Sequence, residues 1–435
     1  MIAFASGDFA FNLYWQSVML YLLFYYTEAL HLPIALTSAA YALASVWDGV
    51  ASFFAGILAD RHARPDRFRF ALVVGTFPLG LCFVLAYAAP HLAGDWQMGW
   101  MLVAHLAFRT LYTLVNVPYL AMSSRISVDS DDRAVVAGAR MLFGATAAIV
   151  VAVGTLPLGE WLAGEGGASA YIAASILFAV IGGVLLLVVG MTYRDDGEIP
   201  VPCEPMAMSG MVISVMRNRA FLALSAAMGA MIVAVTVLDK SVLYYFKYTL
   251  HDEQAGQLTL GWMMVISAVA IPLWLWVARR FGARKVWFWA IGLCSLCLGV
   301  FMMLAIGTAR PVQIFLVAVQ ASIVGLHFAF WAILPDTVEY GQRESGVRAE
   351  AVLYGLAALF QRIAIGLGTL LVGLGLGGEG VHHAIVGDDT YKLVFAIVPL
   401  VFFLLAGLLM LFNPMDRNSH RKILEELEER AASKR

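Results

Sequence analysis

Long apolar runs alternate with short polar segments along the whole chain. Each run holds roughly 20 or more residues, enough for a helix to cross a hydrocarbon core of about 30 Å. Alternating segments of about ten residues, which would indicate a membrane β-barrel, are absent from the sequence. The pattern predicts twelve membrane-spanning helices, at about residues 5–30, 34–60, 68–90, 96–123, 134–158, 168–192, 219–247, 258–278, 286–307, 311–335, 350–376 and 391–413.

Composition strengthens this interpretation. Hydrophobic residues make up 61% of the 435 residues and charged residues only 13%, and the mean hydropathy is +0.81. Soluble globular domains carry about 25% charged residues. The helix-length runs also leave no room for a sizeable soluble domain. We therefore predict an all-α polytopic membrane protein.

The basic residues fall on one side of the predicted membrane. Lys and Arg remain on the cytoplasmic side during insertion. The first run lacks a basic segment before it and a cleavage site after it, so we expect a retained helix and not a signal peptide. If the helices alternate in direction, both termini are cytoplasmic in a multi-pass protein of the bacterial inner (plasma) membrane. Of the 28 Lys and Arg, 21 then share the cytoplasmic face, in segments 61–69, 125–133, 194–219, 279–285, 343–348 and 417–435.

The predicted helices fall into two groups of six. The longest polar stretch contains Pro, Gly and charges, which mark a linker. A basic turn, "GILADRHARPDR", follows the second run, and "WVARRFGARK" follows the eighth run at the matching place. Paired loops of this kind are typical of transporters built from repeated halves. We predict an N-terminal six-helix bundle, a cytoplasmic linker, a C-terminal six-helix bundle and a cytoplasmic tail, at residues 1–193, 194–218, 219–413 and 414–435.

Several motifs resemble those of known transporters. Gly56, Asp60, Arg61 and Arg64 match G-x-L-x-D-R-x-x-R, the motif between the second and third helices of the major facilitator superfamily. Over nearly its whole length the chain more closely resembles the glycoside-pentoside-hexuronide:cation symporters, the melibiose permease family. The stretches that carry this resemblance are "GDFAFNLYWQSVMLYLLFYYTE", "VWDGV", "RTLYTLVNVPYLAMSSRI", "YYFKY" and "WAILPDTVEYGQRESGVRAEA".

The resemblance implies a major facilitator fold, with twelve transmembrane helices in two six-helix halves. It also implies secondary active sugar transport by alternating access. In such a cycle, the motif residues at the cytoplasmic ends of helices serve the conformational change and not substrate recognition. The residues to which the resemblance assigns this role are Gly56, Asp60, Arg61, Asp336, Arg348 and Glu350.

A few charged residues lie inside the predicted spans. Each costs about 2.5 kcal/mol or more if it faces lipid at the bilayer centre, so it must face a cavity or another charge. A buried ion pair that only fixes helix packing is the alternative for each. Four cations against two carboxylates leave an excess of two positive charges, which favours an anionic ligand bound by planar Arg side chains. The six residues are Asp48, Arg109, Arg140, Asp239, Lys240 and Arg362.

Asp48 is the strongest candidate for cation coupling. Ser45 and Ser52 lie three residues before and four after it on the same helix face, so their hydroxyls are further candidates for cation coupling. In the resemblance, Asp48 matches a cation-coupling aspartate, whereas three other family acids fall at Asn12, Ser52 and Asn116. Na⁺ needs a cage of several hard oxygens, whereas a lone buried carboxylate beside an Arg can take up and release a proton. We predict H⁺ coupling over Na⁺, with no other cofactor or metal; permanent pairing of Asp48 with an Arg, and uncoupled transport, is the alternative.

The candidates for substrate binding combine a polar helix face with aromatic residues. His105, Arg109, Tyr112 and Asn116 recur at helical spacing within 96–123. The resemblance places Arg140 and Arg362 at basic positions of the family. Aromatic rings can stack on a pyranose, although packing between helices is the alternative. The predicted substrate-binding residues are Asn12, Trp15, Arg109, Tyr112, Asn116, Arg140, Trp331 and Arg362, and Asn116 is also a candidate for cation coupling.

Other function classes lack support in the sequence. No P-loop, H-E-x-x-H or G-x-S-x-G motif is present, which argues against an ATP-driven pump or an enzyme. The net charge of −2 gives no reason to expect nucleic-acid binding. We therefore predict a monomer in membrane lipid that imports a small glycoside, with a uronide or sulfonated sugar favoured by the cations. A neutral glycoside symporter and a lysophospholipid-type symporter of the same superfamily are the alternatives.

Overall fold

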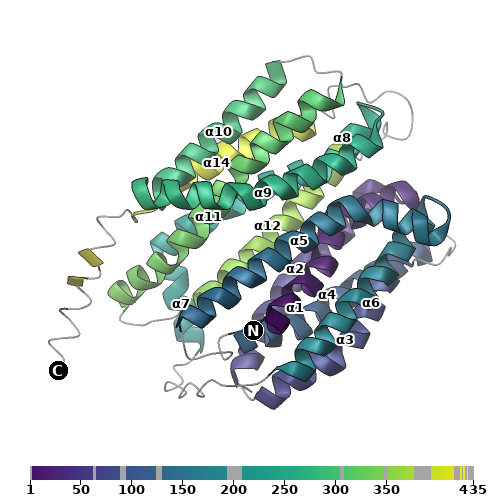
Figure 1. The fold of residues 1–435 in the computed structure, drawn as a ribbon. Coiled ribbons are helices and arrows are strands. Elements are labelled where there is room, and N and C mark those ends of the chain that lie inside the picture. The colour runs from purple at the N-terminus through teal and green to yellow at the C-terminus, as the bar shows by residue number, and fades with distance from the viewer. Residues whose placement is uncertain are drawn as a thin grey trace. The chain divides into compact units, whose positions relative to one another are not determined.

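A computed structural model describes most of the chain, namely residues 2–61, 65–88, 95–123, 130–193, 208–303, 308–345, 350–376, 393–415, 422–423, 425–426 and 429. The secondary structure of these residues is entirely helical (Figure 1). In chain order the elements are α1 (Ile2–Ser17), η1 (Val18–Leu22), η2 (Tyr25–Ala29), α2 (Ile34–Arg61), α3 (Pro65–Tyr87), α4 (Asp95–Ser123), α5 (Ser130–Ala163), α6 (Ala168–Thr192), α7 (Met208–Arg217), α8 (Arg219–Tyr248), α9 (Glu253–Phe281), α10 (Ala283–Met303), α11 (Ala309–Ser345), α12 (Glu350–Leu376), η3 (Leu393–Ile397) and α14 (Val398–Leu411).

The helix lengths follow from the apolar runs. Within the described ranges, eleven helices are long and apolar enough to cross a membrane. The first predicted span, 5–30, corresponds to α1 continued by the π-helical segments η1 and η2. Several of the long helices contain an internal proline, which membrane helices tolerate because neighbouring groups satisfy the freed carbonyls. The prediction of an all-α polytopic membrane protein is confirmed.

Contacts between Cα atoms divide the chain into two compact units. The first unit comprises Met1–Pro200, Asp239–Val265 and Thr369–Val386, and the second comprises the remaining residues. The predicted linker, 194–218, lies outside the described residues up to 207, and its last part forms α7. The boundaries of the two predicted six-helix bundles stay a prediction.

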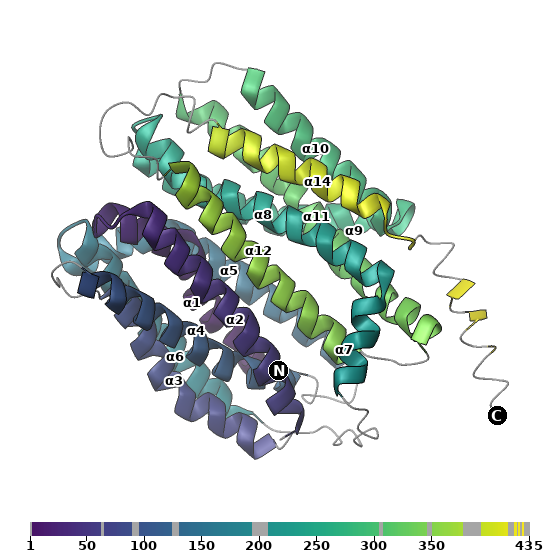
Figure 2. The same ribbon diagram turned by 180° about the vertical axis from the view of Figure 1, so that it is seen from behind.

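In the first unit, α1 packs against α5 and α6, α3 packs against α4 and α6, and α2 packs against α4 (Figure 2). Buried tyrosines of the first helix help to hold these helices together. The hydroxyl of Tyr14 donates to the carbonyl of Ala179 on α6 at 3.2 Å, and that of Tyr26 donates to Ala86 on α3 at 3.0 Å. A buried phenol needs such a partner, so these bonds fix the rotation of the first helix.

The π-helical segment η1 of the first helix offers backbone carbonyls as hydrogen-bond acceptors to side chains of other helices. π-Helical turns are rare and occur often at functional sites. Two backbone carbonyls of η1 accept hydrogen bonds from side chains of other helices. Val18 accepts from the hydroxyl of Tyr41 on α2, and Met19 accepts from Nζ of Lys240 on α8, both at 3.2 Å. The segment therefore anchors polar side chains in an otherwise apolar region.

In the second unit, α10 packs against α11 and α14, and α11 packs against α7. Polar side chains again bond across helices. Nε1 of Trp274 donates to the carbonyl of Ala321 at 2.7 Å, and Nδ2 of Asn218 donates to the carbonyl of Thr337 at 2.7 Å. These bonds join α9 and the start of α8 to α11.

Gly159 allows close packing of α5 against α6. A Cβ atom at this position would lie 2.1 Å from the backbone oxygen of Ala170. Since backbone cannot move aside cheaply, we expect Gly159→Ala to destabilise the purified protein by about 1–3 kcal/mol. Gly99→Ala on α4 is the control, since nothing lies within 4 Å of that Cβ. Thermal unfolding in detergent measures both, and equal midpoints for the two variants would contradict the packing assignment.

Candidate functional site

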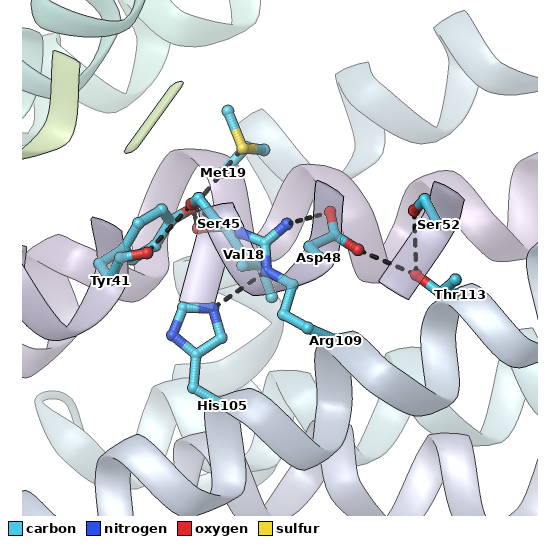
Figure 3. A network of polar contacts seen from close by, with 9 residues as sticks. All are labelled: Val18, Met19, Tyr41, Ser45, Asp48, Ser52, His105, Arg109 and Thr113. Carbon is cyan, nitrogen blue, oxygen red and sulfur yellow. Dashed lines mark hydrogen bonds and ion pairs between the residues drawn. The ribbon is translucent and has the colours of Figure 1, made fainter. Parts of the chain in front are cut away.

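A buried ion pair joins α2 and α4 in the first unit. Nη1 of Arg109 lies 3.4 Å from Oδ2 of Asp48, and the two side chains are 1% and 0% exposed (Figure 3). The other carboxylate oxygen, Oδ1, accepts a hydrogen bond from Oγ1 of Thr113 at 2.9 Å. Both oxygens of this carboxylate therefore have partners on α4, as a charge removed from water requires.

Arg109 is held by several groups besides Asp48. Nε donates to Nε2 of His105 at 3.2 Å, and Nη2 donates to the hydroxyl of Tyr41 at 3.2 Å (Figure 3). Because Nε2 accepts, His105 carries its proton on Nδ1 if it is neutral. The guanidinium carbon also lies 4.7 Å from the ring centroid of Trp15, which is a cation–π contact. Arg109 thus connects side chains of α1, α2 and α4.

The structure places the candidates for cation coupling in different surroundings. Oγ of Ser52 lies 3.3 Å from Oγ1 of Thr113, so these hydroxyls and Asp48 form one hydrogen-bonded chain. Oγ of Ser45 instead donates to the carbonyl of Tyr41, one turn earlier in its own helix, at 3.0 Å. In the part of the chain that the structure describes, the buried Oδ1 of Asn116 has no hydrogen-bond partner.

One aromatic candidate, Trp15, lies beside Arg109, and a second, Tyr112, contacts Trp15. The rings of Trp15 and Tyr112 lie 5.6 Å apart, and Phe11 contacts Tyr112 edge to face at 5.7 Å. Nδ2 of Asn12 donates to the backbone carbonyl of Asp8 at 2.8 Å. Trp15 and Tyr112 therefore form a small aromatic surface next to a cation, whereas Asn12 bonds within α1.

Arg140 forms an ion pair that the sequence analysis missed. Its Nε and Nη2 bind the two carboxylate oxygens of Asp8 on α1, the second bond being 3.3 Å long. The hydroxyl of Tyr119 also donates to Asp8 at 2.6 Å. Asp8 lies within the first predicted span and adds a third carboxylate to the six charged residues identified from the sequence. Four cations and three carboxylates leave an excess of one positive charge in place of the predicted two, and Glu28 and Lys247, which pair with each other, do not change this difference.

The remaining substrate candidates belong to the second unit. Trp331 on α11 is 50% exposed and contacts Phe330 edge to face, and Arg362 on α12 is partly buried. Asp336, which belongs to the predicted conformational motif, is partly buried on α11.

The side chains of the other residues assigned to the conformational motif lie outside the part of the chain that the structure describes. Gly56, Asp60 and Arg61 belong to the last part of α2, and Glu350 begins α12. Arg348 lies outside the described residues. Their role stays a prediction.

The structure also shows contacts of charged residues whose partners the sequence left open. Nζ of Lys240 lies 4.0 Å from the ring centroid of Tyr41, and Oδ1 of Asp239 is buried without a hydrogen-bond partner among the described residues. Near the end of α8, Nζ of Lys247 and the hydroxyl of Tyr248 both bind Oε2 of Glu28 on η2, at 2.6 Å each. Thus α8 meets the first helix at two places.

Several known proteins with similar sequences are named as sugar transporters. The family described as MFS/sugar transport protein matches residues 3–417. An isoprimeverose transporter of Lactiplantibacillus pentosus is 23% identical, over 99% of this chain and 91% of its own. A glucuronide carrier protein homologue of Escherichia coli is 26% identical, over 99% and 95%. A putative sulfoquinovose importer of Salmonella typhimurium is 25% identical, over 98% and 92%.

Solved structures show the same fold. The nucleoside transporter NupG superposes with a TM-score of 0.67 at 15% identity, covering 95% of this chain and 99% of its own. A bacterial homologue of the human lysosomal transporter Spinster superposes with a TM-score of 0.68 at 13% identity, covering 98% and 97%. The chain therefore belongs to the MFS/sugar transport family, as its resemblance to the glycoside-pentoside-hexuronide:cation symporters predicted, and is a multi-pass membrane transporter and not an enzyme.

Proposed function

We propose that the protein imports a glycoside together with a proton across the bacterial inner membrane, as a monomer with cytoplasmic termini. The observation that carries this proposal is the fully buried pair of Asp48 and Arg109 between α2 and α4. A buried carboxylate and guanidinium attract one another strongly in a low-dielectric interior. Removing one charge leaves the other buried without compensation, which is strongly unfavourable. Protonation of Asp48 is such a removal.

The pair offers a mechanism for coupling. When Asp48 takes up a proton, Arg109 loses its counter-charge but keeps its contacts to His105, Tyr41 and Trp15. An acidic group on the substrate then supplies the missing negative charge. Because coupling between two sites is reciprocal, bound substrate favours protonation of Asp48 to the same extent. Release of both ligands restores the ion pair.

The groups around Asp48 favour a proton over Na⁺. The oxygens in its immediate hydrogen-bonded chain are one carboxylate and the hydroxyls of Thr113 and Ser52. A sodium ion there would lie next to the positive charge of Arg109, whose N–H donors cannot coordinate a cation, whereas such ions need a cage of hard oxygens. Uncoupled transport, with the pair closed throughout the cycle, is the alternative that the same geometry leaves open.

The cations support an acidic glycoside as the substrate. One positive charge remains in excess among the intramembrane residues, and the Trp15 ring beside Arg109, together with the Tyr112 ring that contacts it, suits a sugar ring. Two of the relatives are named for acidic sugars, a glucuronide and sulfoquinovose, whereas isoprimeverose is neutral. A neutral glycoside and a lysophospholipid are therefore the competing substrate classes.

Counterflow in proteoliposomes tests the proposal. Vesicles that contain the purified protein are loaded with a uronide, a sulfonated glycoside, a neutral glycoside or a lysophospholipid, and entry of the labelled compound is followed. We expect exchange of an acidic glycoside, and its accumulation under an acid-outside pH gradient without Na⁺. Exchange of the lysophospholipid alone would overturn the substrate class, and accumulation that requires Na⁺ would overturn the choice of ion.

A further inference from the structure

Lys240 is a buried cation without a carboxylate partner. The residue lies on α8 and is 5% exposed. Its Nζ donates to the carbonyl of Met19 at 3.2 Å and faces the ring of Tyr41 at 4.0 Å. No carboxylate in the described ranges forms an ion pair with it. An ammonium group has three donors and a high desolvation cost, and the two groups in direct contact with it, the carbonyl of Met19 and the side chain of Tyr41, are both neutral.

The neighbouring Asp239 does not bind the ammonium directly. Adjacent residues of a helix point about 100° apart, so their side chains do not face each other. Oδ1 of Asp239 is itself buried and has no hydrogen-bond partner within the described part of the chain. The carboxylate and the ammonium attract each other at a distance, but they form no ion pair within the described residues.

A second cation meets the same tyrosine. The guanidinium carbon of Arg109 lies 5.5 Å from the ring centroid of Tyr41, and its Nη2 donates to the hydroxyl of that residue. Lys240 and Arg109 thus gather at one aromatic side chain, within the same compact unit. Only Arg109 has a carboxylate, Asp48, as its partner. An anion bound here would be attracted by both cations.

We infer that Lys240 is the residue that selects an acidic glycoside, by binding the carboxylate or sulfonate of the substrate. This inference rests on the proposed transport function and adds a residue of α8 to the predicted substrate-binding set. An ammonium is a compact charge with three donors that turn freely, so it accepts either a planar carboxylate or a tetrahedral sulfonate. Arg109 becomes the second cation when Asp48 is protonated, and Trp15 provides an aromatic face beside it.

Binding of matched acidic and neutral probes tests this role. The probes are 4-nitrophenyl glycosides: the glucuronide, the galacturonide and the 6-sulfonated glucoside, each with its neutral parent. Affinity is measured for purified wild type, Lys240→Gln, Lys240→Arg and Lys247→Gln. Lys247 is the matched control because it lies on the same helix and is paired with Glu28. If Lys240→Gln does not fold, Asp239→Asn combined with Lys240→Gln replaces it, since this variant keeps the net charge.

We expect wild type to bind at least one acidic probe about tenfold or more tightly than its parent, the size expected of a hydrogen bond to a charged group. Lys240→Gln should lose most of this preference while binding the neutral parent as before. Lys240→Arg and Lys247→Gln should retain it. A preference that survives in Lys240→Gln overturns the inference alone. Equal binding of acidic and neutral probes by wild type overturns the acidic substrate as well, and binding of no glycoside overturns the proposed function.

Discussion

Asp48→Asn is expected to abolish accumulation of substrate driven by a pH gradient, while exchange of substrate across the membrane continues. The amide has nearly the shape of the carboxylate and can still accept the hydrogen bond from Thr113. It cannot take up or release a proton at neutral pH, so the proton gradient no longer drives the cycle. Accumulation and counterflow, measured in the same proteoliposomes, separate these two activities.

Ser45→Ala is the matched control for this experiment. Ser45 lies one turn from Asp48 on α2, but its hydroxyl donates to the backbone of its own helix. Accumulation in this variant should stay near that of wild type. If Asp48→Asn accumulates substrate as wild type does, the ion pair with Arg109 is a packing element and the coupling group lies elsewhere.

Arg109→Gln is expected to be the most destabilising substitution in the first unit. It leaves the carboxylate of Asp48 buried without its cation, which typically costs about 3–5 kcal/mol. Combining it with Asp48→Asn removes both charges, and most of the lost stability should return. The midpoint of thermal unfolding in detergent is the measurement, compared among wild type, the two single variants and the double variant.

Arg140→Gln provides a comparison of the same chemistry at a less buried place. Its pair with Asp8 is about one-fifth exposed, with side-chain values of 20% and 18%. Water reaches these charges, so breaking this pair should lower the free energy of unfolding less than breaking the buried pair.

The double variant of the buried pair also shows whether its two charges interact. If the losses of stability caused by Asp48→Asn and Arg109→Gln simply add in the double variant, the two charges do not interact as the structure indicates.

The helices were predictable because each is an apolar run of membrane length bounded by charges. The central residues of the site were predictable for a related reason. A charge such as Asp48 or Arg109 within such a run is costly unless it is paired, so its presence alone marks it. The four-residue spacing of His105 and Arg109 also placed them on one face, and the structure joins them by a hydrogen bond.

The pairing of these charges was not predictable in the same way. Asp8 and Arg140 are 132 residues apart in sequence, and only the packing of α1 against α5 brings them together. Thr113 follows Arg109 by four residues, but Tyr112 fits the same polar face, so spacing could not choose between them. No sequence signal distinguished η1 from an ordinary helix, and the contact between Met19 and Lys240 was therefore missed.

The π-helical segments constrain how the length of the first helix can change in evolution. A π-helical turn holds more residues than an α-helical turn. Deleting one residue within Val18–Leu22 would let the segment become α-helical and would leave the following residues close to their present orientation. The same deletion in an α-helical part of the first helix would rotate the following residues by about 100°, so that Glu28 would turn away from Lys247 while Asp8, if it precedes the deletion, would keep Arg140. Two ion pairs at opposite ends of one helix thus fix its phase, and the π-helical segments are where the loss of one residue is most easily accommodated.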